Sequence, residues 1–221
     1  MSYCFNDLKN THTAEWQAYI EHDFVRQLGK GTLSDAAFRH YLQQDYLFLL
    51  HFGRAYALAV YKSQNTRDLR HALAGQKIIL ETELQLHIDY CKEWGISEEA
   101  LEQLPEARAT LAYTRYVFDA GSRGNLLDLH VALAPCLVGY AEVSQYLSRY
   151  EKTTRKNNPY EKWLQMYESD AFQNAAKAEI EWLDERLAQV SEERFNELAK
   201  TFRDATRLEI DFWQAGLEQL D

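Results

Sequence analysis

The sequence is poor in the residues that turn a chain between short strands. It has only three prolines and nine glycines among 221 residues. No stretch alternates apolar and polar side chains over the length of a strand, and no internal repeat or low-complexity segment stands out. These absences argue against an all-β fold, which needs many turns. Because 46% of the residues are hydrophobic, the chain can bury a large core, and we expect one domain spanning residues 1–221.

Cysteine and positive charge are also scarce. Cys4, Cys91 and Cys136 are too few and too scattered for a disulfide framework. The formal net charge of −10 disfavours both a nucleic acid and an anionic membrane surface as partners. We find no apolar N-terminal stretch typical of a signal peptide and no segment suited to span a membrane. We therefore expect a cytoplasmic protein with reduced thiols and with neither a nucleic-acid nor a membrane partner.

Helical periodicity accounts for nearly the whole chain. Apolar residues recur at spacings of three and four, and Ser or Asn precedes several of these runs as a candidate N-cap. The predicted helices cover residues 16–28, 35–63, 66–94, a short segment after 97, and 105–121, 125–150, 160–166, 170–190 and 191–217. The clearest loop is 156–159. These elements predict an all-α fold, a compact single-domain helical bundle.

One predicted helix carries a cysteine on its most apolar face. Cys136 and Tyr140 are four residues apart, so they point side by side into the core. Pro135 removes a backbone donor and is expected to kink the helix just before the thiol. On this helix alone, a small buried structural cysteine is the simplest interpretation.

Two carboxylates interrupt apolar faces of other helices. Asp45 lies within an aromatic stripe of the helix 35–63, and Glu209 lies on the apolar face of the last helix. Each one alone could be a structural carboxylate paired with a tyrosine or an arginine. Two of them together with an inward thiol indicate a pocket with perturbed proton affinities. Tyr113 and Tyr167 also lie on apolar faces, where they either fill the core or line a flat ligand.

At these residues the chain resembles the TenA family, also called thiaminase II. The motifs that carry the resemblance are Gly31-Thr32-Leu33, Tyr41-Leu42-Gln43-Gln44-Asp45-Tyr46, Pro135-Cys136 with Gly139-Tyr140-Ala141-Glu142, Tyr160-Glu161-Lys162-Trp163 with Tyr167, and Glu209 ahead of Phe212-Trp213. The resemblance spans nearly the whole chain and implies a haem-oxygenase-like fold assembled as a homotetramer. The implied activity converts a small-molecule pyrimidine, 4-amino-5-aminomethyl-2-methylpyrimidine or thiamine, to hydroxymethylpyrimidine for thiamine salvage. It implies no cofactor.

The resemblance also implies roles for individual residues. Cys136 matches the nucleophile and Glu209 the carboxylate that handles protons. Asp45 matches the residue that holds the amino edge of the pyrimidine. Tyr140 and Tyr167 match tyrosines beside the reacting centre.

Tyr113 matches a tyrosine that stacks on the pyrimidine ring.

The chain departs from the family at two positions near these residues. Phe48 occupies a position where a tyrosine is frequent, and Val138 one where a tryptophan is frequent. The first change removes a hydroxyl from the pocket and the second alters its shape, so rate and substrate preference are open.

Two alternatives remain on the same fold. A metal-dependent oxidase or haem-handling protein would use Glu81 or Glu83, His87 and Glu142 as ligands. All seven histidines lie within the first 130 residues, however, and the helix 170–190 has none, so we expect no metal and interpret His87 as a surface or packing histidine. A non-catalytic pyrimidine-binding protein is the second alternative. No basic recognition helix supports DNA binding.

Overall fold

Regular structure in this chain is helical throughout. The computed structural model describes residues 2–221, so Met1 of the predicted domain lies outside the described residues. Within that range no strand forms, and the predicted all-α fold is confirmed. In chain order the elements are α1 (Phe5–Thr11), α2 (Thr13–Ile20), α3 (Asp23–Lys30), α4 (Asp35–Lys62), α5 (Thr66–Ile78), a π-helical turn η1 (Ile79–Glu83), α6 (Leu84–Glu93), α7 (Glu98–Glu102), α8 (Arg108–Arg123), α9 (Leu126–Arg149), α10 (Glu161–Glu168), α11 (Asp170–Leu187) and α12 (Glu192–Glu218).

Local side-chain chemistry fixes where several helices begin. The predicted helix starts Ser34, Ser97, Ser169 and Ser191 each accept a hydrogen bond from a backbone N–H in the first turn. Asn125, from which the core helix was predicted to run, does the same. Such bonds satisfy donors that have no partner inside the helix. These five starts were therefore readable from the sequence.

Tertiary contacts move two other boundaries away from prediction. Helix α8 begins at Arg108, three residues after the predicted start at Pro105. The side chain of Gln44 donates to the Pro105 carbonyl at 3.0 Å and accepts from the Ala107 N–H at 2.8 Å. Helix α8 also continues past the predicted stop at Gly121 to Arg123. A Cβ at Gly121 would lie 2.7 Å from the Leu129 side chain, so this glycine serves the close approach of α9.

The predicted helices 16–28 and 66–94 are both interrupted. The first is replaced by separate helices α2 and α3, with His22 accepting from the Phe24 N–H at the start of α3. The second contains η1, whose wider turn shifts the register between α5 and α6. Such π-turns occur frequently at functional sites.

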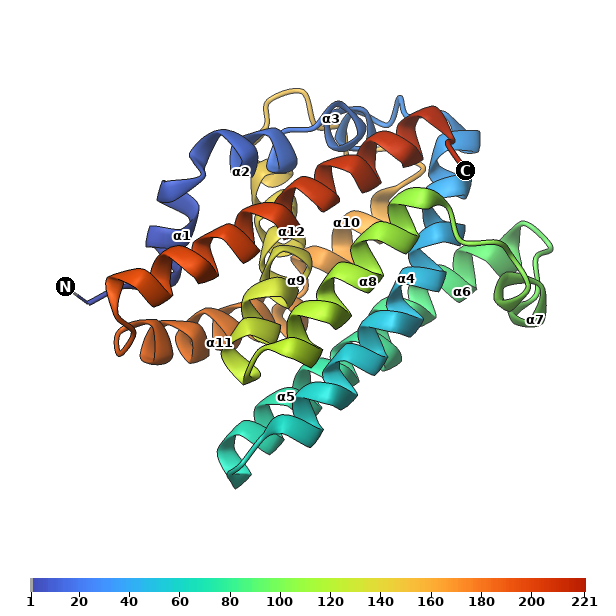
Figure 1. Ribbon diagram of the computed structural model, residues 1–221. Helices are drawn as coiled ribbons and strands as arrows, with labels where there is room; N and C mark the ends of the chain where they lie inside the picture. The colour runs from blue at the N-terminus through green and yellow to red at the C-terminus, as the bar shows by residue number, and fades with distance from the viewer. Residues whose placement is uncertain (1) are drawn as a thin grey trace.

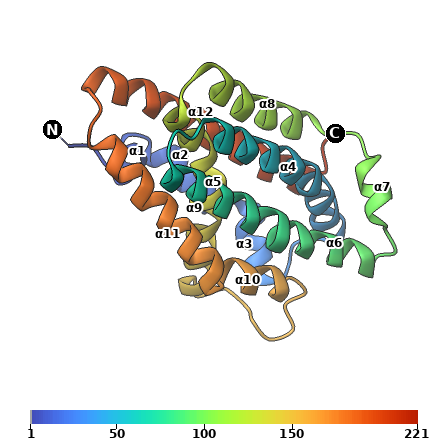
Figure 2. The ribbon, with the colours of Figure 1, turned by 90° about the horizontal axis from the view of Figure 1, so that it is seen from below.

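Helix α9 is the centre of the molecule. It packs against α2, α3, α4, α8, α10, α11 and α12, and Figure 1 shows the long helix α12 crossing it while α4 and α8 run along one side. Seen from below, α5 and α6 lie beside α4, and α11 lies beside α9 (Figure 2). The candidate residues on α4, α9 and α12 therefore face one shared core.

Helix α9 also corrects an expectation from the sequence. By length and composition it could cross a membrane, whereas we expected no such segment. Its apolar window is 78% buried inside the protein, as befits the core helix of a bundle. Its apolar character follows from being surrounded by other helices.

Helix α2 packs closely against α9 at a glycine. Helix α9 continues as one element through Pro135, whose carbonyl accepts a hydrogen bond from the Tyr19 hydroxyl at 3.1 Å. A Cβ at Gly139 would lie 2.2 Å from the Tyr19 ring. Because no side chain could fit there, Gly139 allows α2 to approach the helix that carries Cys136.

Candidate active site

Three central helices bring the predicted thiol and carboxylates together in the core. Cys136 comes from α9, Asp45 from α4 and Glu209 from α12. Their exposed fractions are only 3%, 2% and 1%. The site is therefore closed from solvent, and electrostatic interactions within it are strong.

Asp45 is held by two side chains of the core. The Tyr41 hydroxyl donates to its Oδ2 at 2.9 Å, and His87 Nε2 lies 2.6 Å from the same oxygen. Trp163 in turn donates to the Tyr41 hydroxyl at 3.2 Å. Among the described residues no hydrogen bond reaches Oδ1, so this oxygen is free to accept one from a ligand.

The interpretation of His87 as a surface or packing histidine was wrong. Its side chain is fully buried, and its second nitrogen, Nδ1, lies 2.7 Å from the Glu83 carbonyl. Both ring nitrogens thus face acceptors, which a doubly protonated imidazolium satisfies. Burial lowers the pKa of His87, but the charge and hydrogen bond of Asp45 outweigh it and raise the pKa above its usual value. His87 and Asp45 form a buried ion pair.

Glu83, which the sequence indicated only as an alternative metal ligand, is a third carboxylate in the site. The Tyr167 hydroxyl donates to its Oε1 at 2.5 Å, while Oε2 is buried without a partner among the described residues. Burial and the charge of Asp45 raise the pKa of Glu83 to about 8. The one available signal was its i, i+4 spacing to His87. The π-turn that directs both residues inward has no such signature.

Glu209 is hydrogen-bonded by a predicted site tyrosine. The Tyr113 hydroxyl donates to Glu209 Oε1 at 2.8 Å. Burial raises the pKa of Glu209 well above its usual range, and this bond only partly opposes the effect. Burial thus favours the protonated, neutral form of Glu209 relative to that of an exposed glutamate.

Aromatic rings form the walls of the site. The Phe48 ring lies 4.9 Å from Tyr113 and 5.6 Å from Phe212, between centroids. On the other side Tyr140 lies 5.0 Å from Tyr167. All of the predicted site residues are thus buried in one region, and Tyr113 adds a hydrogen bond to the aromatic surface predicted for it.

The surroundings of Cys136 do not favour a resting thiolate. Burial, followed by the charges of Glu209, Glu83 and Asp45, raises the pKa of the thiol well above its usual range. Cys136 is therefore a neutral thiol among acids, and any nucleophilic role requires its proton to leave during the reaction.

The alternative metal ligands predicted from the sequence are not brought together. Glu81 is exposed at the surface. Glu142 accepts from Lys9 Nζ at 2.5 Å and from Trp16 Nε1 at 2.8 Å, on the side of α9 that faces the N-terminal helices. Within residues 2–221, Glu83, His87 and Glu142 do not form a cluster with metal-binding spacing.

This architecture defines the class of protein. A solved domain of unknown function from Shewanella denitrificans, described as having a heme oxygenase-like fold, superposes with a TM-score of 0.76, covering 98% of this chain and 93% of its own. Its identity is 14%, so the comparison concerns the fold alone. The protein has a haem-oxygenase-like fold, as predicted.

The family follows from closer relatives. Residues 10–219 match the model of the TENA/THI-4/PQQC family. A protein of Haemophilus influenzae, described only as uncharacterized, is 44% identical over 203 residues, which are 92% of this chain and 94% of the relative. An aminopyrimidine aminohydrolase of Halalkalibacterium halodurans is 35% identical over 205 residues, 92% of this chain and 91% of that protein. This chain belongs to the TENA/THI-4/PQQC family.

A solved structure agrees with this assignment. A protein of Silicibacter sp. TM1040, described as a TenA family transcription regulator, superposes with a TM-score of 0.89 at 41% identity. The alignment covers 98% of this chain and 97% of that one. Its description differs from the hydrolase name, so the site must supply the argument for function.

Proposed function

We propose that this protein is an aminopyrimidine aminohydrolase that hydrolyses 4-amino-5-aminomethyl-2-methylpyrimidine to hydroxymethylpyrimidine, with Cys136 as the nucleophile. The observation that carries the proposal is a buried thiol surrounded by three carboxylates, two of which have raised pKa values. A regulator or a simple binding protein has no need of such a costly arrangement. The name of the Halalkalibacterium halodurans relative supports the same reaction.

The substrate class matches the charge of the site. Both 4-amino-5-aminomethyl-2-methylpyrimidine and thiamine carry a positive charge beside the carbon that reacts. Such a cation suits a site lined by the carboxyl groups of Asp45, Glu83 and Glu209, because its charge favours their ionised forms. The aromatic walls at Phe48 and Tyr113 suit the flat pyrimidine ring.

Asp45 and Glu209 interact with different groups of the pyrimidine: Asp45 accepts a hydrogen bond, and Glu209 donates a proton. Asp45 Oδ1 accepts from the exocyclic amino group, while Oδ2 stays bonded to Tyr41 and His87. Glu209, protonated and oriented by Tyr113, delivers its proton to a ring nitrogen. Protonation makes the ring electron-poor enough for the sulfur to add.

The reaction then balances in two stages. The sulfur of Cys136 bonds to a ring carbon, its proton passes to a neighbouring carboxylate, and the ring nitrogen takes the proton of Glu209. Electrons returning from the ring expel the amine from the exocyclic carbon as ammonia. Water bonds to that carbon and loses one proton to the ammonia, which leaves as ammonium. The ring nitrogen returns its proton to Glu209, the neighbouring carboxylate returns its proton to the sulfur, and the bond between the sulfur and the ring breaks.

Glu83 is the carboxylate to which we assign the thiol proton. Its Oε2 has no partner among the described residues, while Oε1 is bonded to Tyr167. A carboxylate whose pKa is about 8 exchanges protons readily near neutral pH, and this property suits an acceptor for the thiol proton. We therefore add Glu83 to the predicted residues as a proton carrier.

The direct test is release of ammonia from purified protein. With the aminomethylpyrimidine we expect ammonia and hydroxymethylpyrimidine in equal amounts, and with thiamine the same pyrimidine together with the thiazole. Tight binding of the pyrimidine without any ammonia would identify a non-catalytic binding protein and overturn the proposal. Comparing kcat/KM for the two substrates decides which one the site prefers.

We further propose that the protein works in the cytoplasm as a homotetramer. Tyr61 at the end of α4 is 86% exposed, and Leu73 on α5 is 56% exposed. The connected ends of α4 and α5 project from the bundle (Figure 1). Exposed apolar side chains on one projection support a contact between subunits. Light scattering coupled to size-exclusion chromatography measures the assembly, and a monomer would contradict it.

A further inference from the structure

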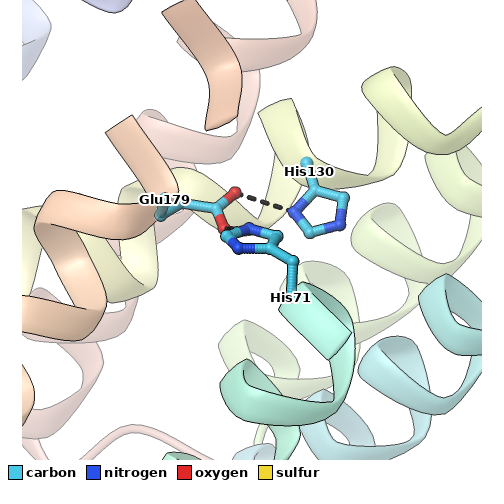
Figure 3. A group of neighbouring side chains, drawn as sticks. All are labelled: His71, His130 and Glu179. Carbon is cyan, nitrogen blue, oxygen red and sulfur yellow. Dashed lines mark hydrogen bonds and ion pairs between the residues drawn. The ribbon is translucent and has the colours of Figure 1, made fainter. Parts of the chain in front are cut away.

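A second cluster of titratable side chains lies outside the candidate active site. His71 of α5, His130 of α9 and Glu179 of α11 meet where these three helices pack together (Figure 3). His71 Nε2 lies 2.8 Å from Glu179 Oε2, and His130 Nδ1 lies 2.8 Å from Glu179 Oε1. The proposed hydrolysis uses none of them.

We propose that His71, His130 and Glu179 bind one divalent transition-metal cation, with Zn²⁺ as the ion that suits them best. Two imidazoles and one carboxylate are a ligand set of three-ligand zinc sites. Their donor atoms all lie within 4.8 Å of one another. Tetrahedral binding at about 2.0–2.1 Å needs ligand atoms roughly 3.4 Å apart. The widest separation must therefore close by up to about 1.4 Å, while the two histidine–carboxylate contacts of 2.8 Å open by about 0.6 Å.

The ring of Trp182 packs against both imidazoles and orients them. The Trp182 ring is stacked on His71 with centroids 5.4 Å apart and an interplanar angle of 3°, and it lies 4.1 Å from His130. His130 Nε2 makes no hydrogen bond to the described residues, so the packing against Trp182 holds this ring in place. Ligands held in position before the ion arrives favour binding.

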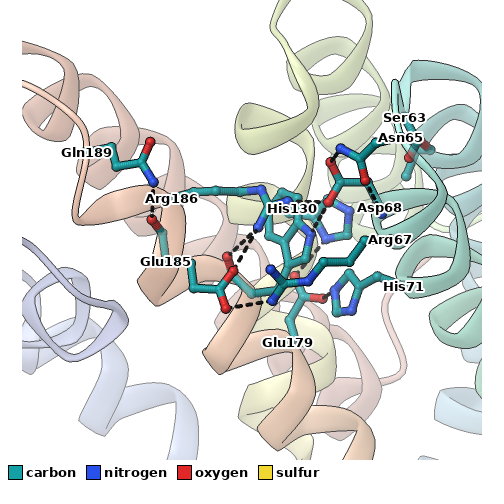
Figure 4. A network of polar contacts seen from close by, with 12 residues as sticks. Ser63, Asn65, Arg67, Asp68, His71, His130, Glu179, Glu185, Arg186 and Gln189 are labelled. Carbon is teal, nitrogen blue, oxygen red and sulfur yellow. Dashed lines mark hydrogen bonds and ion pairs between the residues drawn. The ribbon is translucent and has the colours of Figure 1, made fainter.

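A polar network that includes Asp68 and Arg186 surrounds the cluster (Figure 4). This network fixes Trp182. Its Nε1 donates to Asp68 Oδ1 at 2.8 Å, and the Arg186 guanidinium carbon lies 3.6 Å from its ring centroid. Asp68 also accepts from Asn65 at 2.8 Å and pairs with Arg186. The cluster thus has the second layer of support that a pre-formed ligand site requires.

Solvent can reach the cluster of His71, His130 and Glu179 from one side. The His71 side chain is 16% exposed, whereas those of His130 and Glu179 are 0% and 2% exposed. The ion can therefore enter beside His71, and water can occupy the fourth position there. A cation bound here would replace the hydrogens that Glu179 now shares with His71 and His130.

The alternative is a hydrogen-bonded trio that only joins three helices. A metal titration separates the two. Protein stripped with a chelator and then titrated calorimetrically with Zn²⁺ should bind one ion per chain. His71→Ala and Glu179→Gln should each weaken binding at least about a hundredfold, because each removes a direct ligand. Zn²⁺ at a hundred times its Kd should raise the Tm of the wild type by about 5 °C or more, and should leave that of His71→Ala unchanged.

Matched controls distinguish this site from others on the chain. His51→Ala removes a half-buried histidine beside Arg54 and Arg115, and Cys4→Ser removes the cysteine nearest the surface. Both should bind Zn²⁺ like the wild type. Glu179→Gln keeps the side-chain shape, so it should fold, which circular dichroism checks. Visible absorption of bound Co²⁺ reports the site in the wild type without any variant. No stoichiometric binding by the wild type, or equal binding by His71→Ala and Glu179→Gln, would overturn the proposal.

Discussion

Asp45 and His87 are 42 residues apart in the sequence and form a hydrogen bond of 2.6 Å inside the bundle. Because the other nitrogen of His87 faces the Glu83 carbonyl, the imidazole brings a positive charge to a site that otherwise holds only acids. This pair and the Tyr41 hydroxyl hold Oδ2 of Asp45 and leave Oδ1 for a ligand.

Cys136→Ser should remove nearly all hydrolysis, by at least about a hundredfold in kcat, and leave pyrimidine affinity nearly unchanged. Serine has almost the size of cysteine, but its hydroxyl is far harder to ionise among carboxylates. Steady-state rates beside binding titrations with hydroxymethylpyrimidine measure both quantities. A variant that keeps even a few per cent of the wild-type rate would exclude the covalent route and favour water activated by Glu209.

Glu209→Gln and Asp45→Asn should fail in different ways. The first should bind pyrimidine and lose turnover, because an amide cannot deliver the proton that Tyr113 now helps to orient. The second should also weaken binding, by about tenfold or more, since it removes a charged acceptor and breaks the pair with His87. Binding titrations with hydroxymethylpyrimidine and steady-state rates measure the two effects separately. Equal loss of affinity in both variants would contradict the separate roles.

Phe48→Tyr should raise turnover or leave it unchanged. The substitution restores the hydroxyl frequent in TenA relatives on a ring that lies 4.9 Å from Tyr113, and one added oxygen beside polar groups is a small change. Comparing kcat/KM for the aminomethylpyrimidine and thiamine would show which substrate benefits. A folded variant about tenfold slower would mean that the pocket is adapted to the phenyl ring.

Glu83→Gln should flatten the dependence of stability on pH. Burial and the charge of Asp45 raise the pKa of Glu83 in the folded state to about 8, from about 4.5 in the unfolded chain. Protonation therefore favours the folded state, and this stability is present below about pH 4.5 and lost as pH rises through about 8. Urea unfolding at pH 5 and pH 8 should show a fall in the wild type that exceeds the fall in the variant by on the order of a few kcal/mol. If the free energy of unfolding fell equally in the two proteins between pH 5 and pH 8, the raised pKa of Glu83 would be refuted.

Gly139→Ala should destabilise the protein by about 1–3 kcal/mol. The new methyl would lie 2.2 Å from the Tyr19 ring, which is fully buried and cannot turn away. Gly53→Ala is the matched control, since its methyl would meet the end of the flexible and partly exposed Leu80 side chain. Urea unfolding of both variants makes the comparison. Equal stability would show that α2 is not seated through Gly139.

The sequence by itself determined the local features of this protein. N-caps such as Ser34 and Asn125 act through bonds to their own first turn, so they are readable without tertiary structure. The faces that carry Asp45, Cys136 and Glu209 follow from helical spacing, and an unusual residue on an apolar face is visible in the sequence. The family resemblance added the roles of these residues, which stay predictions until the variants are measured.

Only the tertiary structure decided which distant side chains meet. The pairing of His87 with Asp45 depends on the register that the π-turn before α6 imposes. Likewise, the meeting of His71, His130 and Glu179 depends on how three helices pack. Periodicity specifies which face of a helix is buried, but it contains no information on the neighbour that covers that face. Pairings across 40 to more than 100 residues, such as 42 for His87 with Asp45 and 108 for His71 with Glu179, arise from the fit of side chains between helices, and only the folded chain specifies that fit.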